Sequence, residues 1–178
     1  MSSQGGRKTI IAGNWKMNKT PAEATSLAKA IVEGVASQFK GEALPEIVLC
    51  PTFVCLSEVL NQVKGSPCQV GAQNMDYRDS GAFTGEISPP MLTAMAVQYV
   101  LIGHSERRQF FGETNQSVNL KVKAALAHGL VPVMCVGELL EQREQGLTDS
   151  VVKEQVVEGL AGIAAADAAK VVVAYEPV

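Results

Sequence analysis

The sequence lacks a long hydrophobic run, and it also lacks a long run of basic residues. No apolar stretch approaches the roughly 20 residues that a membrane-spanning helix needs. The polar start, Met1 to Lys8, has no apolar stretch of the kind found in a signal peptide. The net charge is −3 over 178 residues. This charge gives no attraction to nucleic acid or to an anionic membrane, so we expect neither as a partner.

Cysteine and histidine are scarce and poorly spaced for metal binding. The chain has four cysteines and two histidines, with no C-x-x-C pair and no histidine at ligand spacing from a cysteine. We therefore expect no metal site. Most of the cysteines lie in apolar runs, where a reduced cysteine packs as a small hydrophobic residue. This pattern favours a reducing, cytoplasmic location.

Six short apolar runs recur along the chain and are typical of buried strands. Most are rich in Val and Ile, and several are apolar at consecutive positions, which favours a parallel sheet covered on both faces. The runs are Thr9 to Gly13, Ile47 to Cys50, Gln69 to Ala72, Tyr99 to Gly103, Leu130 to Val136, and Val171 to Tyr175.

Stretches with helical periodicity separate these runs. Thr20, Pro21 and Glu23 have the pattern of a capped helix start. Further helices are expected at Ser57 to Val63, Pro90 to Val97, Val118 to His128, and Thr148 to Ile163. Strand and helix alternate about every 30 residues, the size of a βαβ unit, which predicts an α/β fold. The alternation leaves open a barrel or an open doubly wound sheet, and no linker divides the chain, so we expect one domain over residues 1–178.

Polar residues follow several of the predicted strands. Asn14 and Lys16 come after the first strand. His104 follows the fourth strand, and Glu176 follows the sixth. Parallel strands bring their carboxyl ends to one edge of the sheet, where α/β enzymes place their active sites. The sequence therefore predicts a site at this edge.

Each of these side chains also has a simpler interpretation. Lys16 alone fits a surface lysine beyond a strand, and Glu176 alone fits a solvated loop carboxylate, although a carboxylate at a dry strand end could act as a general base. His104 precedes Ser105 and Glu106, which look like the first turn of a helix. The ring could simply cap that helix, or it could stay neutral there and donate a hydrogen bond. Spacing alone leaves these alternatives open.

Three further features bear on the site. Glu106 is placed to pair with Lys16 or with a following arginine. Cys135 lies within a strand and has no base near it in sequence, so its expected role is packing and not nucleophilic attack. The segment Asn74 to Glu86 is long for a strand-to-helix connection, and long ordered loops are usually functional or interfacial.

Several segments are similar, in order and spacing, to those of the triosephosphate isomerase family. The three signature segments are Gly13 to Asn18, Ile102 to Arg108, and Ala174 to Val178. The supporting segments are Gly71 to Asn74, Gly81 to Glu86, and Cys135 to Glu138. The resemblance covers almost the whole chain. It implies a (β/α)8 TIM barrel, of which this chain covers about strands 1–6 and helices 1–5.

The resemblance implies a role for each matched residue. Glu176 would be the base that moves a proton between adjacent carbons, and His104 the neutral electrophile that polarises the carbonyl. Asn14 and Lys16 would contact substrate, with Lys16 offsetting phosphate and enediolate charge. The implied supporting residues are Ser105, Glu106 and Cys135.

The family resemblance also implies a substrate and an assembly. The substrates would be dihydroxyacetone phosphate and D-glyceraldehyde 3-phosphate, interconverted in glycolysis and gluconeogenesis. Proton transfer beside a carbonyl needs a base, donors for an oxyanion and positive charge for phosphate. It needs no cofactor, so none is expected. The resemblance implies a homodimer, in which the loop Asn74 to Glu86 docks into a second subunit and Thr84 reaches toward that subunit's site.

The chain departs from the family in length. A full (β/α)8 barrel runs to about 250 residues, whereas this chain ends at Val178, just after the sixth expected strand. Loops after strands seven and eight often hold phosphate in such barrels, so we expect residues 1–178 alone to have little isomerase activity. A non-catalytic fragment or assembly module remains an alternative. A different phosphosugar enzyme would need a Schiff-base lysine at a later strand end or a metal cluster, and the sequence offers neither.

Overall fold

The computed structural model describes residues 8–39 and 43–176. The chain folds into two compact units. Unit 1 is Met1–Gln73 and unit 2 is Asn74–Val178. Each unit contains parallel strands joined through helices, which confirms the predicted α/β class. The expectation of one domain over residues 1–178 stays a prediction. The polar start up to Arg7 and the last two residues of the third signature segment lie outside the described residues.

Unit 1 is built on a parallel sheet with β2 in the middle. Its strands are β1 (Ile10–Asn14), β2 (Glu46–Cys50) and β3 (Cys68–Ala72). Asn14 pairs with Cys50 at the carboxyl ends of β1 and β2. β2 and β3 are mostly buried, whereas β1 is partly exposed, with Ile11 58% exposed. The first strand therefore departs from the expectation that all strands are covered on both faces.

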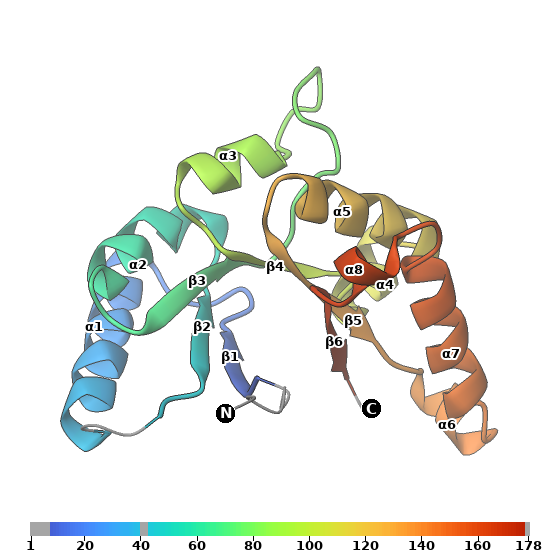
Figure 1. Cartoon of the computed structure of the whole chain (residues 1–178), viewed down its shortest axis with the longest axis horizontal. Coiled ribbons are helices and arrows are strands. Elements are labelled where there is room, and N and C mark those ends of the chain that lie inside the picture. Colours follow the sequence, from blue (N-terminus) through green and yellow to red (C-terminus); the bar gives the residue numbers. More distant parts are fainter. Residues whose placement is uncertain (1–7, 40–42, 177–178) are drawn as a thin grey trace, which may run out of the picture. The chain divides into compact units, whose positions relative to one another are not determined.

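The helices of unit 1 lie together on one face of this sheet (Figure 1). They are α1 (Pro21–Gln38), the short 3-10 turn η1 (Phe53–Cys55) and α2 (Leu56–Val63). The predicted cap is confirmed: Thr20 N–H donates to Glu23 Oε2 at 2.8 Å, and Glu23 N–H donates to Thr20 Oγ1 at 3.5 Å. This reciprocal pair satisfies two backbone groups at the start of α1.

Unit 2 is built on three parallel strands with β5 in the middle. Its strands are β4 (Tyr99–Ile102), β5 (Val131–Val136) and β6 (Val172–Tyr175). Cys135 of β5 pairs with Ala174 of β6, so the two strands end side by side. β4 is buried throughout, whereas β6 exposes 46% of both Val173 and Tyr175. The buried core of unit 2 therefore lies around β4 and β5.

Among the residues of unit 2 that the structure describes, six helices accompany the strands. They are α3 (Pro89–Ala94), α4 (Ser105–Phe111), α5 (Asn115–Ala127), α6 (Leu140–Glu144), α7 (Thr148–Gly159) and α8 (Ala165–Ala168). The central helix is α5, which contacts β4, β5 and α7. Within residues 8–39 and 43–176, no helix combines the length and the apolar character needed to cross a membrane.

The elements differ from the predictions mainly at their ends. All six strands are confirmed, with ends shifted by at most one residue. The helix predicted over Pro90 to Val97 ends earlier, because Ala96 adopts a left-handed φ of 66° and reverses the chain. The helix predicted over Thr148 to Ile163 also ends early, at Gly159. The short elements η1, α6 and α8 were not predicted, because a few residues give no periodicity to read.

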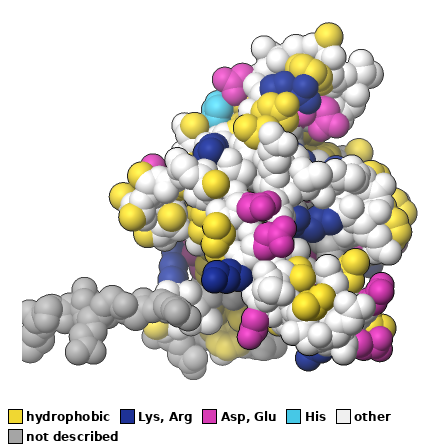
Figure 2. Space-filling model, turned by 90° about the vertical axis from the view of Figure 1, so that its right-hand side faces the viewer, with side chains coloured by type: hydrophobic (Ala, Val, Ile, Leu, Met, Phe, Trp, Pro, Cys, Tyr) yellow, Lys and Arg dark blue, Asp and Glu magenta, His cyan; other side chains and the backbone are white. Residues whose placement is uncertain are grey.

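The loop Asn74 to Glu86 projects from unit 2, and Figure 2 shows hydrophobic, basic and acidic side chains crowded on this projection. Arg78 organises it. The Arg78 guanidinium makes hydrogen bonds of 2.8 and 2.7 Å to the two Asp76 carboxylate oxygens. It also lies over the Phe83 ring, 3.3 Å from the ring centre. The loop therefore has a small core of its own, built from charge pairing and a cation–π contact.

Candidate active site

His104 lies just past the carboxyl end of β4 and caps α4, as the sequence predicts. Its Nδ1 atom accepts a hydrogen bond of 3.2 Å from the backbone N–H of Glu106. A ring nitrogen that accepts a hydrogen bond carries no proton, so this contact assigns the proton of the neutral ring to Nε2. The His104 side chain is only 10% exposed.

Glu176 brings its carboxylate to the protonated nitrogen of this ring. Glu176 Oε1 lies 2.7 Å from His104 Nε2, and Glu176 Oε2 accepts a hydrogen bond of 2.8 Å from the Ser105 backbone N–H. The Glu176 backbone N–H donates to Val136 O at 2.8 Å, which extends the pairing of β5 and β6 by one residue. The pair offers a proton acceptor beside a neutral hydrogen-bond donor. Proton transfer next to a carbonyl requires both groups.

Two glycines allow close packing at the strand ends, Gly103 against α5 and Gly137 against the backbone of Glu176. At Gly103, whose φ is +74°, an added Cβ would lie 2.6 Å from Val118 Cγ2. At Gly137, an added Cβ would lie 2.4 Å from the carbonyl oxygen of Glu176. A larger residue at Gly137 would push the backbone of Glu176 away, and one at Gly103 would collide with the Val118 side chain. The left-handed φ of Gly103 adds a conformational reason for glycine.

A buried ionic cluster supports the end of β4. Glu113 Oε2 accepts a hydrogen bond of 3.1 Å from the Gly103 backbone N–H, and Glu113 Oε1 pairs with Arg107 Nε at 2.7 Å and with Lys121 Nζ. Lys121 Nζ also donates to Asn74 Oδ1 at 2.8 Å. Burial acts to raise the pKa of Glu113, but the hydrogen bonds from Lys121 and Arg107 together outweigh burial and hold this pKa below its ordinary value.

The supporting roles of Glu113 and Lys121 were not predicted from the sequence. Lys121 occupies a buried position of α5, and its neighbours Val118 and Val122 are fully buried. Lysine is rarely buried without a partner, so a lysine among the apolar positions of a helix was the available signal. Glu113 precedes the capping Thr114 and carries no periodic signal of its own.

Glu138 forms a second buried charge at the end of β5. Its Oε1 atom accepts hydrogen bonds from Tyr175 OH at 3.0 Å, Arg143 Nη1 at 3.0 Å and Thr148 Oγ1 at 3.2 Å. Its own backbone N–H, followed by Tyr175, Arg143 and Thr148, lowers the pKa of Glu138. The charged carboxylate thus ties the end of β6 to α6 and to the start of α7.

Two of the three residues with implied supporting roles contact the His104 and Glu176 pair. Ser105 and Glu106 contribute the backbone N–H groups described above. Cys135 is buried in β5, close to the end of the strand. Their roles in chemistry stay predictions. The expected pairing of Glu106 with Lys16 or with a following arginine stays a prediction as well.

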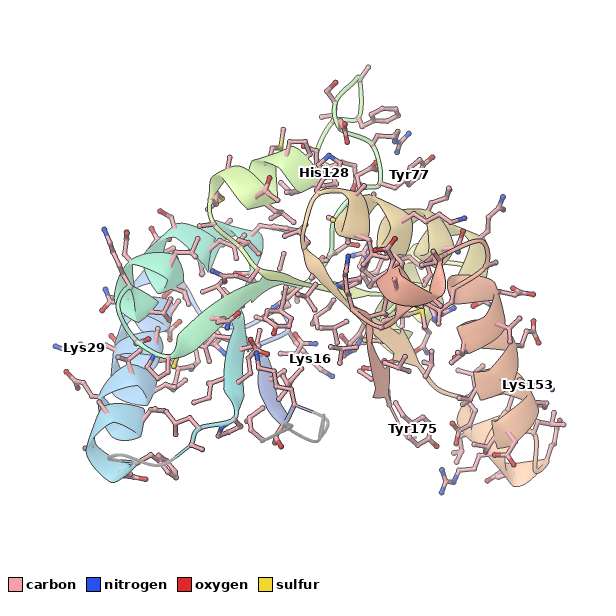
Figure 3. The ribbon with its side chains drawn as sticks, in the orientation of Figure 1. Lys16, Lys29, Tyr77, His128, Lys153 and Tyr175 are labelled. Carbon is pink, nitrogen blue, oxygen red and sulfur yellow. The ribbon has the colours of Figure 1, made fainter. Side chains whose placement is uncertain are left out.

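Asn14 and Lys16 share a tight turn at the end of β1. The Lys16 backbone N–H donates to Asn14 Oδ1 at 2.9 Å, and Gln73 Nε2 donates to Lys16 O at 2.9 Å. Lys16 has a left-handed φ of 53°, which is rare for a residue with a side chain. Its exposed side chain is labelled in Figure 3. Both residues belong to unit 1, so their convergence with His104 on one molecule stays a prediction.

Thr84 lies exposed in the projecting loop. A second contact joins this loop to α5: His128 Nε2 lies 3.1 Å from Asp79 Oδ1, while His128 Nδ1 lies 2.8 Å from Ala124 O. Figure 3 labels His128 at the end of α5 and Tyr77 in the loop. No active role is predicted for His128, and its contacts link the loop to the helix. The dimer role of Thr84 stays a prediction.

Acidic, thiol and imidazole groups are dispersed outside these contacts. Across residues 8–39 and 43–176, no three His, Cys, Asp or Glu side chains are grouped so that they could hold a metal ion. A cavity of about 310 Å³ lies at the strand ends, bordered by Ser105, Gly137 and Glu138 among others.

Comparison with known proteins identifies the family. The triosephosphate isomerase family model matches residues 9–178. The chain is 51% identical over 172 residues to triosephosphate isomerase of Clostridium botulinum (strain Eklund 17B / Type B), and the match covers 97% of this chain and 67% of the relative. The protein of the same name from Clostridium perfringens (strain 13 / Type A) is 52% identical over the same length and coverage.

A solved structure shows the same fold. The crystal structure of triosephosphate isomerase from Bartonella henselae matches with a TM-score of 0.86 and 37% sequence identity, and the match covers 97% of this chain and 69% of that one. The likeness confirms the predicted (β/α)8 TIM-barrel class, of which the chain holds β1 to β6. This chain belongs to the triosephosphate isomerase family, which is a family of enzymes.

Proposed function

We propose that this chain carries the catalytic residues of a triosephosphate isomerase, which interconverts dihydroxyacetone phosphate and D-glyceraldehyde 3-phosphate. The observation that carries the proposal is the 2.7 Å contact between His104 Nε2 and Glu176 Oε1. It joins a carboxylate to a neutral N–H donor at the carboxyl ends of parallel strands. Barrel enzymes of this class hold their substrates at that end.

In the proposed reaction, Glu176 acts as the general base. Its carboxylate removes a proton from the carbon beside the substrate carbonyl. The Nε2–H group of His104 donates a hydrogen bond to the carbonyl oxygen, and this bond strengthens as negative charge develops there. The hydroxyl proton on the neighbouring oxygen then moves to the former carbonyl oxygen, and Glu176 returns its proton to the former carbonyl carbon. These two transfers leave the carbonyl group on the adjacent carbon and complete the isomerisation.

Substrate must displace an existing contact to reach these groups. Both carboxylate oxygens of Glu176 are engaged, one with His104 Nε2 and the other with the Ser105 N–H. The substrate carbonyl therefore replaces Glu176 Oε1 as the acceptor on His104, and the carboxylate turns to the substrate carbon. The base is thus presented when substrate occupies the site.

Lys16 and Asn14 supply substrate binding in this proposal. The Lys16 ammonium is a point charge that offsets phosphate and enediolate charge. Asn14 contacts substrate and also holds the turn of Lys16, as its 2.9 Å hydrogen bond to the Lys16 N–H supports. A phosphate-bearing triose fits a site with one cation, one base and one neutral donor.

The two histidines of the chain provide a matched test. We expect His104→Gln to lower kcat by about 100-fold or more, because the donor to the carbonyl oxygen loses its geometry. We expect His128→Gln to retain turnover. The assay follows the conversion of D-glyceraldehyde 3-phosphate by the natural full-length protein. The proposal fails if that protein turns over neither triose phosphate, or if both substitutions have equal effects.

We also propose that residues 1–178 expressed alone are poorly active. In the described residues, β1 pairs only with β2 in its unit, and β6 pairs only with β5. Each strand therefore presents an edge that invites association with other chains. A comparison of the isolated 178-residue polypeptide with the natural protein tests this proposal, and equal kcat/KM values would contradict it.

A homodimer through the loop Asn74 to Glu86 is part of the same proposal. The preorganised loop, with Arg78 between Asp76 and Phe83, supports docking because little loop entropy is lost on binding. We expect Thr84→Arg to shift the sedimentation coefficient to that of a monomer. The matched control is Asn61→Arg on the exposed side of α2. A dimer that survives Thr84→Arg would exclude this loop as the interface.

The four cysteines support a proposed cytoplasmic location. All four are free and buried, and burial raises the pKa of Cys50 to about 12. Buried thiols without disulfides suit a reducing compartment. Localisation of a fluorescently tagged protein tests this, and export to an oxidising compartment would contradict it.

A further inference from the structure

We propose that Arg108 is a positioning residue, which holds the ends of β4 and β5 at the separation that lets His104 and Glu176 meet. The inference rests on the proposed isomerase function of that pair. Arg108 lies on α4, four residues after His104. Its side chain reaches back toward the strand ends. Among the described residues, its hydrogen bonds go to Gly103, Asn115 and Cys135 and not to the His104 or Glu176 side chains.

The guanidinium of Arg108 joins two strand ends at once. Arg108 Nε donates to the carbonyl oxygen of Gly103 at 2.8 Å, directly before His104. Arg108 Nη2 lies 3.5 Å from the carbonyl oxygen of Cys135, near the end of β5. Cys135 pairs with Ala174 on β6, two residues before Glu176. The rigid, planar fork therefore sets the spacing between the backbone that carries His104 and the backbone that aligns Glu176.

The third donor of Arg108 anchors the fork to the helices. Arg108 Nη1 donates to Asn115 Oδ1 at 2.7 Å, and Asn115 Nδ2 donates in turn to Glu158 Oε2 at 3.0 Å. The chain of contacts runs from the strand ends through α4 and α5 to α7. A side chain braced at its far end can transmit a fixed distance, whereas a mobile one cannot.

The surroundings of Arg108 are shaped to its guanidinium. An added Cβ at Gly103 would lie 3.1 Å from Arg108 Nη2, so glycine makes room for it. Burial lowers the pKa of Arg108, and the negative charges of Glu113 and Glu176 oppose this shift. Burying a guanidinium costs desolvation free energy. A role in fixing the geometry of the strand ends explains why a charged side chain occupies this position.

Kinetics of two variants separate geometry from charge in the natural full-length protein. Arg108→Lys keeps the charge and loses the fork, whereas Arg108→Met keeps the length and loses both. We expect kcat to fall about 100-fold in Arg108→Met and at least 10-fold in Arg108→Lys, with KM within about threefold, because a displacement of about 1 Å costs this much. Near-normal kcat in Arg108→Lys would overturn the proposal, because charge alone would then suffice.

A spectroscopic readout reports the pair itself. Nitrogen-15 NMR of the histidine rings should show the Nε2-protonated tautomer of His104 with a hydrogen-bonded Nε2–H proton, and His128→Gln assigns the signals. We expect this protected proton to disappear in both Arg108 variants. Its retention in the folded Arg108→Lys protein would overturn the proposal even if Arg108→Met does not fold.

Asn119→Ser is the matched control for lost stability. Asn119 Nδ2 bridges α5 to Gly159 O at 2.9 Å and to Ala161 O at 3.0 Å, so it also joins two elements through backbone carbonyls. We expect this variant to melt at a lower temperature while kcat and the His104 proton signal stay unchanged. If the wild-type protein has no isomerase activity, the proposed function is wrong. The NMR comparison would still show whether Arg108 positions His104 and Glu176.

Discussion

The two units hold their predicted site residues in different ways. In unit 1, Lys16 is exposed, and its turn is held by neutral amides and a left-handed backbone. In unit 2, the side chains of His104 and Glu176 are 10% and 25% exposed and contact each other directly. Buried charged side chains support the backbone next to this pair. Glu113, for example, pairs with Arg107 and Lys121 and accepts a hydrogen bond from the Gly103 N–H.

This difference fits the roles proposed for the residues of the two units. A lysine that pairs with a diffusing phosphate needs access to water and only approximate placement, since a point charge acts in any direction. A base that removes a carbon-bound proton needs placement to a fraction of an ångström. Buried and fully paired side chains supply that precision, because their alternatives are costly.

The largest expected effect comes from Glu176 in unit 2, the proposed base. Glu176→Gln removes the proton acceptor but keeps the size of the side chain, so we expect kcat to fall by about 1,000 to 10,000-fold. Circular dichroism and thermal melting should show an intact fold. Glu154→Gln, an exposed carboxylate on α7, is the control and should leave turnover unchanged. Residual turnover above 10% of wild type in Glu176→Gln would assign the base to another group.

The buried cluster behind the pair should govern stability. Glu113→Gln leaves Lys121 buried without its carboxylate partner, and we expect the free energy of unfolding to fall by about 4 kcal/mol. Urea titration monitored by fluorescence measures it. Glu33→Gln, on the exposed surface of α1, is the control and should change stability by less than about 0.5 kcal/mol. A loss for Glu113→Gln no larger than that for the control would show that the cluster is energetically neutral.

The same cluster predicts the direction of acid sensitivity. The pKa of Glu113 is lower in the folded protein than its ordinary value of 4.5, so the folded state binds this proton more weakly than the unfolded state. The stability from Glu113 is therefore complete above about pH 4.5 and is lost as the pH falls through the folded pKa. Unfolding measured from pH 6 downward should show a shallower loss in Glu113→Gln, and identical slopes would contradict the assignment.

Sequence predicts the strands, and the residues that lie at their ends, far better than it predicts the side chains that support them. Strands such as Tyr99–Ile102 appear as uninterrupted apolar runs, and His104 and Glu176 follow them at once. Glu113 and Arg108 act across distances in sequence, through backbone groups of other elements. No periodicity encodes such contacts, so only coordinates show which carbonyl or amide a long side chain reaches.

Two glycines with nearly equal φ separate crowding from backbone strain. Gly103 has φ +74° and no room for a Cβ, whereas Gly112 has φ +67° and open space around it. We expect Gly112→Ala to lower the free energy of unfolding by about 1 kcal/mol through the left-handed conformation. Gly103→Ala should cost about 3 kcal/mol, since steric overlap adds to the strain. Equal losses in urea titrations would mean that α5 moves away from Gly103 without cost.

The smallest effect concerns the strained lysines of unit 1. Lys16 and Lys19 both have left-handed φ values, 53° and 74°, and both are exposed. Replacement by glycine relieves this strain but adds freedom to the unfolded chain, and the two terms nearly cancel. We expect each of Lys16→Gly and Lys19→Gly to raise the free energy of unfolding by at most about 1 kcal/mol.

Thermal and urea unfolding of the two glycine variants test whether contacts of the Lys16 side chain offset the strain of its left-handed φ. Equal small gains in the free energy of unfolding would show that the backbone strain alone sets the effect at both positions. The proposed substrate-binding role of Lys16 would then make no difference to its strain. A gain for Lys19→Gly with a loss for Lys16→Gly would show the opposite. Contacts of the Lys16 side chain would then outweigh its strain, and Lys16 in unit 1 would be held by side-chain contacts, as His104 and Glu176 are in unit 2.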